Sequence, residues 1–136
     1  MRQRKVSLID ANIVLRYLLD DHPDQSPASA KFMEEVEIGE KEAYLHDVVI
    51  AEVVWTLEKF YKVPKKEISH ALSELISMRG IGVSNRSVLL RALRIYADKN
   101  VDFVDALLGA LALEKGAEVI SFDKDFKKMG VPLKAI

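Results

Sequence analysis

The sequence of 136 residues contains no cysteine, no long hydrophobic run and almost no net charge. Without cysteine, the chain cannot form a disulfide, use a thiol nucleophile or bind zinc or an iron–sulfur cluster through sulfur. This absence fits a reducing compartment, and we expect a cytoplasmic location. No segment approaches the roughly 20 apolar residues of a membrane-spanning helix, so we expect no membrane association. Residues 1–5 are basic, but Asp10 and Asn12 interrupt the following apolar run, which argues against a signal peptide.

The composition otherwise describes an ordinary globular protein. The net charge of −1 neither predicts nor excludes binding to nucleic acid, because a local basic patch is sufficient for that. No glycine-rich phosphate-binding loop is present, so neither a Walker-type NTPase nor a dinucleotide-binding protein is supported. The length suits one core, and we expect a single domain over residues 1–136.

Short apolar segments alternate with longer helical patterns along the chain. Strands separated by helices favour an α/β fold with a parallel sheet that is covered on both faces. In such sheets, ligands gather at the carboxyl ends of the strands. We expect strands over 6–9, 43–46, 81–83, 118–122 and 132–135, and helices over 12–20, 27–36, 47–61, 65–78, 87–98, 102–115 and 123–129. Ser26 is the expected N-cap of the second helix, with Pro27 at its first position.

Four acids are set into apolar segments, where an unpaired carboxylate is costly. Asp10 and Asp123 each directly follow an expected strand, Asp105 lies in the first turn of a helix, and Glu52 interrupts an apolar helical face. Four acids at one point require a counter-charge, and carboxylate oxygens are ligands that Mg²⁺ and Mn²⁺ prefer. Such an ion lowers the pKa of bound water and holds phosphodiester oxygens. We therefore expect these four acids to bind metal and to be catalytic.

Neighbouring polar residues have a supporting role in this hypothesis. Asn12 lies two residues after Asp10 and can form a hydrogen bond with an acid or a water molecule, and Ser121 can do the same beside Asp123. Gly109 and Ala112 lie on the same helical face as Asp105 and allow a close approach to another backbone, so we expect Asp105 to lie deep.

Each acid also has a purely structural interpretation. Asp10 is a favoured residue type for capping the following helix, and Glu52 can pair with a nearby lysine or arginine. Asp102 and Asp105 begin the same helix, and we assign the capping role to Asp102 because Asp105 lies further inside. His46 precedes a helix near a strand end, which allows it to border the site.

The order and spacing of these segments resemble the PIN-domain ribonucleases, and most closely the small VapC-type toxins. The resemblance runs from about residue 6 to residue 134. The segments that carry it are Leu8-Ile9-Asp10-Ala11-Asn12, Glu52 within its helix, Val104-Asp105-Ala106-Leu107, and Ser121-Phe122-Asp123-Lys124-Asp125-Phe126.

This resemblance implies a three-layer α/β/α sandwich with a central parallel sheet and Mg²⁺- or Mn²⁺-dependent endoribonuclease activity on RNA. It places Asp10, Glu52, Asp105 and Asp123 on the four acidic positions of the family. Asn12 then matches a common polar position, Ser121 stands where threonine is more usual, and Asp125 matches a frequent but less essential acid. The resemblance further implies a homodimer, and a toxin in a toxin–antitoxin pair with a small antitoxin protein.

Three other functions are compatible with parts of this pattern. A housekeeping RNA-processing nuclease of the same family would carry the same acids. A phosphatase with an aspartyl nucleophile at Asp10 normally needs a second aspartate two residues later, where this chain has Asn12. A non-catalytic binding module would have no need for the full set of four acids.

Overall fold

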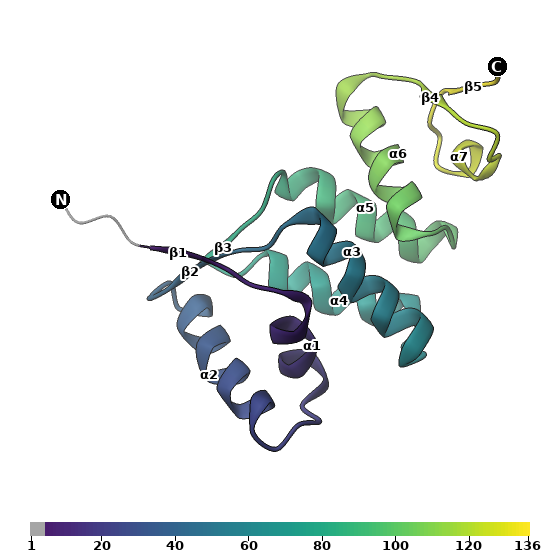
Figure 1. Cartoon of the computed structure of the whole chain (residues 1–136). Helices are drawn as coiled ribbons and strands as arrows, with labels where there is room; N and C mark the ends of the chain where they lie inside the picture. The colour runs from purple at the N-terminus through teal and green to yellow at the C-terminus, as the bar shows by residue number, and fades with distance from the viewer. Residues whose placement is uncertain (1–4) are drawn as a thin grey trace.

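The computed structural model describes residues 5–136, and nearly all of the basic start discussed above lies outside the described residues (Figure 1). Strands and helices alternate along most of the chain. In order, the elements are β1 (Val6–Leu8), α1 (Ala11–Leu19), α2 (Gln25–Glu37), β2 (Glu42–Tyr44), α3 (Asp47–Trp55), η1 (Thr56–Phe60), α4 (Lys65–Ile76), β3 (Ile81–Gly82), α5 (Arg86–Lys99), α6 (Phe103–Lys115), β4 (Val119–Ile120), α7 (Asp125–Lys128) and β5 (Leu133–Lys134).

All strand pairings in the described part of the chain are parallel, and they form two separate groups. One group has the order β1-β2-β3, with Leu8 opposite Tyr44 and Ala43 opposite Ile81. The other consists of β4 and β5, with Val119 opposite Leu133. Figure 1 shows the second group beyond α6, away from the first. The predicted α/β/α class with parallel strands is confirmed, although its strands are divided between two groups.

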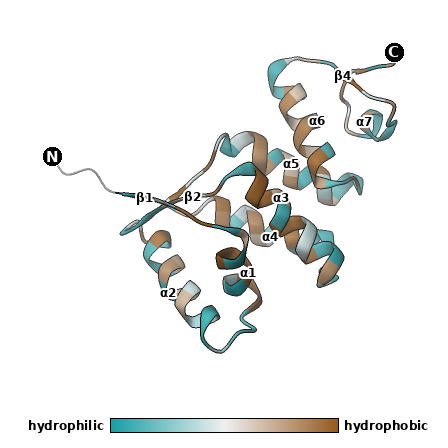
Figure 2. Cartoon of the chain, in the orientation of Figure 1, coloured by the Kyte–Doolittle hydropathy of each residue, from teal (hydrophilic) through white to brown (hydrophobic). Residues whose placement is uncertain are grey.

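Most of the core lies between the first strand group and helices α1 to α6, and Val119, Phe126 and Val131 extend it into the C-terminal segment. Leu45, which directly follows β2, and Ile50 on α3 are fully buried. Leu72 on α4 and Leu93 on α5 are also fully buried. Each such side chain contributes about 1.5–3 kcal/mol through burial of its apolar surface. Figure 2 shows hydrophobic and hydrophilic residues alternating around most helices, whereas the first half of α3 is mostly hydrophobic.

Helix α3 ends earlier than the pattern over 47–61 predicts. The segment Thr56–Phe60 continues it as one turn of π-helix, with Leu57 buried. A π turn inserts one residue into the helical repeat and rotates the side chains that follow. No apolar spacing in the sequence distinguishes this turn from ordinary α-helix.

Helix α2 begins two residues before Pro27, so the predicted cap at Ser26 is wrong. Ser26 is buried, and its hydroxyl accepts a hydrogen bond from the backbone N–H of His22 at 3.1 Å. The free N–H groups of Asp24 and Gln25 instead donate to Nδ1 of His22, at 3.2 and 2.9 Å. An imidazole nitrogen thus supplies the acceptor that the first turn needs.

The expectation that β1 is a buried strand is also wrong. Val6 is 57% exposed and Leu8 is 79% exposed. Large apolar side chains are also exposed around β4, where Ile120 is 58% exposed and Phe122 is 83% exposed. Within residues 5–136, one edge of each of these two strands has no partner strand. Val119 of β4 is nevertheless buried, so only one face of that strand is open.

Within residues 5–136, no helix combines the length and the apolar character that crossing a membrane requires.

Candidate active site

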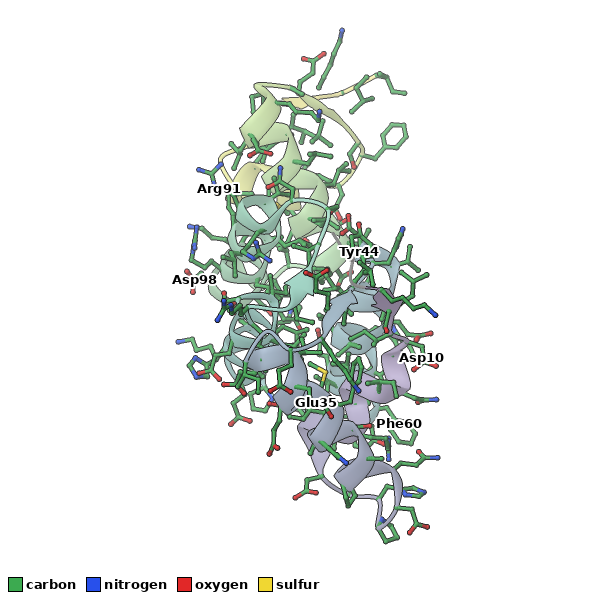
Figure 3. All side chains as sticks on the ribbon, turned by 90° about the vertical axis from the view of Figure 1, so that its left-hand side faces the viewer. Asp10, Glu35, Tyr44, Phe60, Arg91 and Asp98 are labelled. Carbon is green, nitrogen blue, oxygen red and sulfur yellow. The ribbon has the colours of Figure 1, made fainter. Side chains whose placement is uncertain are left out.

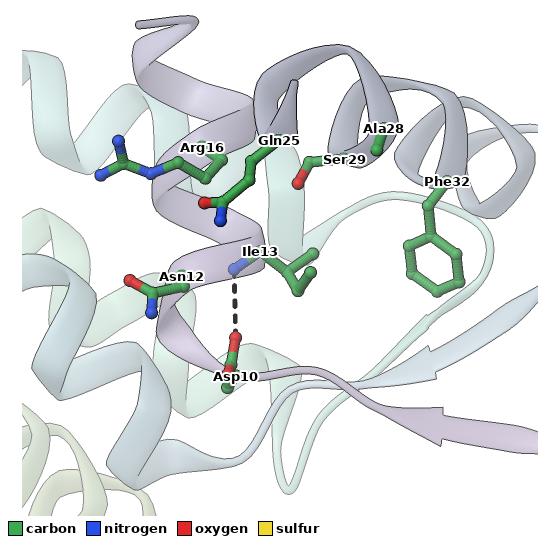
Figure 4. Close-up of a pocket in the computed structure, with 8 residues that line it drawn as sticks. All are labelled: Asp10, Asn12, Ile13, Arg16, Gln25, Ala28, Ser29 and Phe32. Atoms are coloured by element: carbon green, nitrogen blue, oxygen red, sulfur yellow. Dashed lines mark hydrogen bonds between the residues drawn. The ribbon is translucent and has the colours of Figure 1, made fainter. Parts of the chain in front are cut away.

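Asp10 lies between β1 and α1 and is exposed. Its Oδ1 accepts a hydrogen bond from the backbone N–H of Ile13 at 3.1 Å (Figure 4), so the capping role considered above is confirmed. The cap uses one carboxylate oxygen and leaves the other for a second ligand. Asp10 and the exposed Asn12 border a pocket of about 460 Å³ between α1 and α2.

A guanidinium group, which the sequence analysis did not identify, lies in the same pocket. Arg16 donates to Asp21 at 2.8 Å and to the hydroxyl of Tyr61 at 3.2 Å. The hydrogen bond with Tyr61 raises the pKa of Arg16 most, and the negative charge of Asp21 raises it further. Arg16 therefore keeps its positive charge. Figure 4 shows Arg16 on the same side of α1 as Asn12 and Gln25. The contact with Tyr61 joins residues 45 positions apart, and no local sequence signal indicates it.

Glu52 is exposed on α3, although its apolar neighbours predict burial. The residues around it explain the difference, because Val53 and Val54 are buried while Val48 and Trp55 are exposed. Within the described part of the chain, no lysine or arginine lies within 4 Å of Glu52. The ion-pair interpretation of this acid therefore finds no support in residues 5–136.

Asp105 is half-buried in the first turn of α6. It borders a pocket of about 260 Å³ whose other wall is formed by α3 and η1, including Trp55 and Glu58. Burial raises the pKa of Asp105, and the negative charges of Asp123, Asp102 and Asp125 raise it further. Asp105 and Asp123 are therefore close enough to repel each other.

Asp102 occupies the N-cap position of α6, as predicted, although its side chain makes no capping hydrogen bond. The predicted close approach along α6 is present at Gly109. A Cβ atom there would lie 2.6 Å from Sδ of Met129 and 3.3 Å from a methyl group of Val131. The absence of a side chain at this position lets the segment after α7 pack against α6, although Asp105 is not as deep as we expected.

Asp123 is exposed in the loop between β4 and α7, and two hydrogen bonds shape this loop. The Ser121 hydroxyl accepts from the backbone N–H of Asp123 at 2.9 Å, and Oδ1 of Asp123 accepts from the N–H of Asp125 at 2.9 Å. Asp125 pairs with Lys128 at 3.2 Å. Ser121 and Asp125 thus hold the backbone on either side of Asp123.

The structure brings two of the four acids together and leaves the set incomplete. Asp105 and Asp123 interact, but neither Asp10 nor Glu52 is among the charges that act on Asp105. Within residues 5–136, no three histidine, aspartate or glutamate side chains are arranged to hold a metal ion. The donors are nonetheless hard carboxylate oxygens with excess negative charge, which fits Mg²⁺ or Mn²⁺ in chemical kind.

A buried polar group adjoins the Asp105 pocket and was not predicted. The hydroxyl of Tyr96 donates to Glu58, which also pairs with Lys59 at 2.9 Å. Burial opposes the charge of Glu58, but the hydrogen bonds from Tyr96 and Lys59 lower its pKa overall. Burial and the Glu58 contact raise the pKa of Tyr96, so it stays a donor. Glu58 lies in η1, and the π turn determines which way it points.

His46 occupies the N-cap of α3, where its Nδ1 accepts from the backbone N–H of Val48 at 3.0 Å. It is exposed, and its ring meets that of Tyr44 edge-on. This cap gives His46 a structural role at the end of β2.

Comparison with known proteins identifies relatives over nearly the whole chain. A model of the PIN domain matches residues 7–132, a range that includes all four acids. The chain is also 27% identical over 126 residues to a protein named VapC ribonuclease from Aquifex aeolicus (strain VF5). That alignment covers 92% of this chain and 93% of the relative.

Proposed function

Because the chain belongs to the PIN domain family, we propose that it is a metal-dependent endoribonuclease that hydrolyses phosphodiester bonds in RNA. The observation that supports this proposal is the half-buried carboxylate of Asp105, which borders a pocket, feels the negative charge of Asp123 and lies with Asp123 inside the matched range. The relative named VapC ribonuclease supports RNA as the substrate class.

We assign metal binding to Asp10, Glu52, Asp105 and Asp123, with Mg²⁺ or Mn²⁺ as the ion. When bound, such an ion activates water and neutralises negative charge on the phosphodiester. The chain's own contribution is to hold the carboxylates at fixed positions. The cap at Asp10 fixes its side chain, and the Ser121 and Asp125 hydrogen bonds fix the backbone of Asp123. Asn12 serves as a polar neighbour that orients water or substrate.

The decisive experiment measures cleavage of RNA by purified protein with Mg²⁺, with Mn²⁺ and with EDTA. Substituting Asp10→Asn keeps the capping acceptor but removes the charge, so we expect cleavage to fall by about 100-fold or more. Asp98→Asn is a matched control, because Asp98 is an exposed aspartate on α5 that projects from the opposite side to Asp10 (Figure 3). Equal cleavage by the Asp10 variant and the control, or full activity in EDTA, would reject the proposal.

We further propose that this nuclease acts as the toxin of a type II toxin–antitoxin pair, as a cytoplasmic homodimer with a cognate antitoxin protein. The name of the relative supports this role. Induced expression should then stop growth of a bacterial host, and co-expression of a small neighbouring reading frame should restore it. Arrest by wild type but not by Asp10→Asn ties the toxicity to the acids. Unimpaired growth with active nuclease present would instead favour a housekeeping RNA-processing role.

A further inference from the structure

Strands β1 and β4 each have one edge that no strand occupies within residues 5–136. β1 pairs with β2 along its other edge, and β4 pairs with β5. A free edge presents backbone N–H and C=O groups that can pair with another strand. Since the existing pairings are parallel, a parallel β1–β4 pair would join the two groups into one continuous sheet.

Apolar side chains are exposed beside both of these edges. Val6 and Leu8 lie two residues apart on β1, so both side chains are on one face, and both are exposed. Beside β4, Leu108, Leu111 and Ile120 line an apolar groove of about 380 Å³ between α6 and β4. A strand with two apolar side chains on one face suits a groove with an apolar wall and a free strand edge.

The two edges belong to one chain, but they are held apart within it. Helix α6 packs antiparallel along α5, and contacts at both ends fasten the two helices. At one end the rings of Tyr96 and Phe103 meet edge-on with their centroids 6.0 Å apart. At the other end Nδ2 of Asn85 donates to Oε2 of Glu114 at 2.8 Å. Figure 1 shows β4 on the far side of α6 from β1, so the chain does not pair its own two edges in this arrangement.

A second copy of the chain supplies both missing edges at once. If β4 of each copy docks on β1 of the other, the two contacts are identical and related by a two-fold axis, so the assembly closes as a dimer. No free β1 or β4 edge then remains to recruit a further chain. This closure distinguishes a second copy from an unrelated strand, which would satisfy only one of the two edges.

We propose that two copies exchange the strands of their C-terminal units (α6 to β5): α6 stays packed on its own α5, and β4 of each copy pairs in parallel with β1 of its partner. Parallel strands end at the same edge of a sheet. The pairing therefore places Asp10, which follows β1, beside Asp123 of the partner subunit, which follows β4, and brings the partner's Asp105 with it. Each site then takes acids from both chains. This last step rests on the proposed function, whereas the strand pairing does not.

Disulfide trapping tests the strand pairing without any assay of activity. The chain has no cysteine, so introduced cysteines report only on each other. Leu8 on β1 and Ile120 on β4 are both exposed. Cysteines introduced by Leu8→Cys and Ile120→Cys become neighbours when β1 of one copy pairs with β4 of the other. When the two single variants are mixed and oxidised, we expect a covalent dimer on a non-reducing gel that neither variant forms alone. Circular dichroism verifies that each variant is folded.

The same experiment has outcomes that overturn the proposal. If a variant that carries both cysteines forms its disulfide within one chain and runs as a monomer, then β1 and β4 pair within that chain and not between copies. No crosslink in the mixture shows that the edges do not pair. Light scattering of the unaltered protein gives an independent check: we expect twice the chain mass of 15.3 kDa, and a monomer at all concentrations contradicts the exchange.

Complementation between inactive variants tests the shared site. Asp10→Asn and Asp123→Asn each inactivate both sites of their own dimers. In a mixed exchanged dimer, one site receives both substitutions and the other receives neither, so refolding equal amounts together should restore about one quarter of wild-type cleavage. No recovery despite crosslinking between copies shows that each site is built from one chain. If the wild type itself does not cleave RNA, the proposed function fails while the trapping result stands.

Discussion

The segment from β1 to α5 and the segment from α6 to β5 bury their apolar residues to different extents. In the first segment, Leu45, Leu72 and Leu93 are fully buried, and only β1 and a few helix positions expose large apolar side chains. In the second, Leu108 and Phe122 are 47% and 83% exposed. A small unit cannot enclose its own apolar residues, because its surface is large relative to its volume.

This comparison links stability to function. The larger segment carries Asp10 and Glu52 on a well-packed framework, and the smaller unit carries Asp105 and Asp123 on a framework with an open apolar groove. The four acids that we propose to act together are thus divided between a region with many fully buried side chains and a region with an exposed apolar groove. Assembly of the site and burial of the groove are, in our proposal, the same event.

The largest effect should come from matched truncations in the two segments. Leu72→Ala opens a cavity in the core of the first segment and should lower the free energy of unfolding by about 2–5 kcal/mol. Leu108→Ala removes a half-exposed side chain and should cost less than about 1 kcal/mol in dilute protein. Urea denaturation measures both values. Repeating it at high protein concentration sharpens the test, because the cost of Leu108→Ala should increase when the groove is occupied. Equal costs at all concentrations would contradict the difference between the segments.

The two acids of the α7 loop should differ strongly in activity. Asp123→Asn removes the charge but keeps an oxygen to accept from the backbone N–H of Asp125, so the loop is retained. We expect RNA cleavage to fall by about 100-fold. Asp125→Asn weakens a surface pair with Lys128 and removes the smallest of the charges that act on Asp105, so it should change cleavage by less than about fivefold. Initial rates in Mn²⁺ give both numbers, and similar losses in the two variants would contradict the assignment of Asp123.

A smaller effect should follow the loss of the Tyr96–Glu58 hydrogen bond, which joins α5 to η1 within the first segment. Tyr96→Phe leaves the ring in place and removes the donor to a partly exposed carboxylate, which should cost about 1–2 kcal/mol at neutral pH. The pKa of Glu58 is lowered by folding, so its contribution is complete above the ordinary glutamate pKa and is lost as the pH falls below about 4. The difference between wild type and variant should therefore narrow in acid. A difference that stays constant down to pH 3 would rule out this contact as the cause.

The smallest effect concerns the charge at Asp105. Because burial and neighbouring acids disfavour the ionised carboxylate, Asp105→Asn should raise Tm in EDTA, by about 2 °C. Added Mn²⁺ should stabilise the wild type more than the variant, since a bound ion adds stability by linkage. Differential scanning fluorimetry with and without Mn²⁺ measures both effects. A lower Tm for the variant in EDTA would show that the Asp105 charge stabilises the fold.

Local features of this protein were predictable from the sequence, because they depend on neighbours along the chain. Apolar periodicity indicated nearly every helix, and the position of Asp102 at the start of α6 was predicted. The π turn at Thr56–Phe60 and the His22 cap were not, since each depends on packing or on a hydrogen bond that has no distinctive residue pattern.

The amino-acid sequence by itself determined the α/β class and the parallel strands, and it supplied the four acids of the proposed site, because hydrophobic periodicity and residue type are properties of short segments. Only the tertiary structure decided which of those acids meet. Asp105 and Asp123 are brought together by the packing of α6 against the segment after α7, whereas Asp10 stays apart because β1 and β4 do not pair within the described chain. Strand edges look alike in sequence, and their pairing depends on contacts between distant segments.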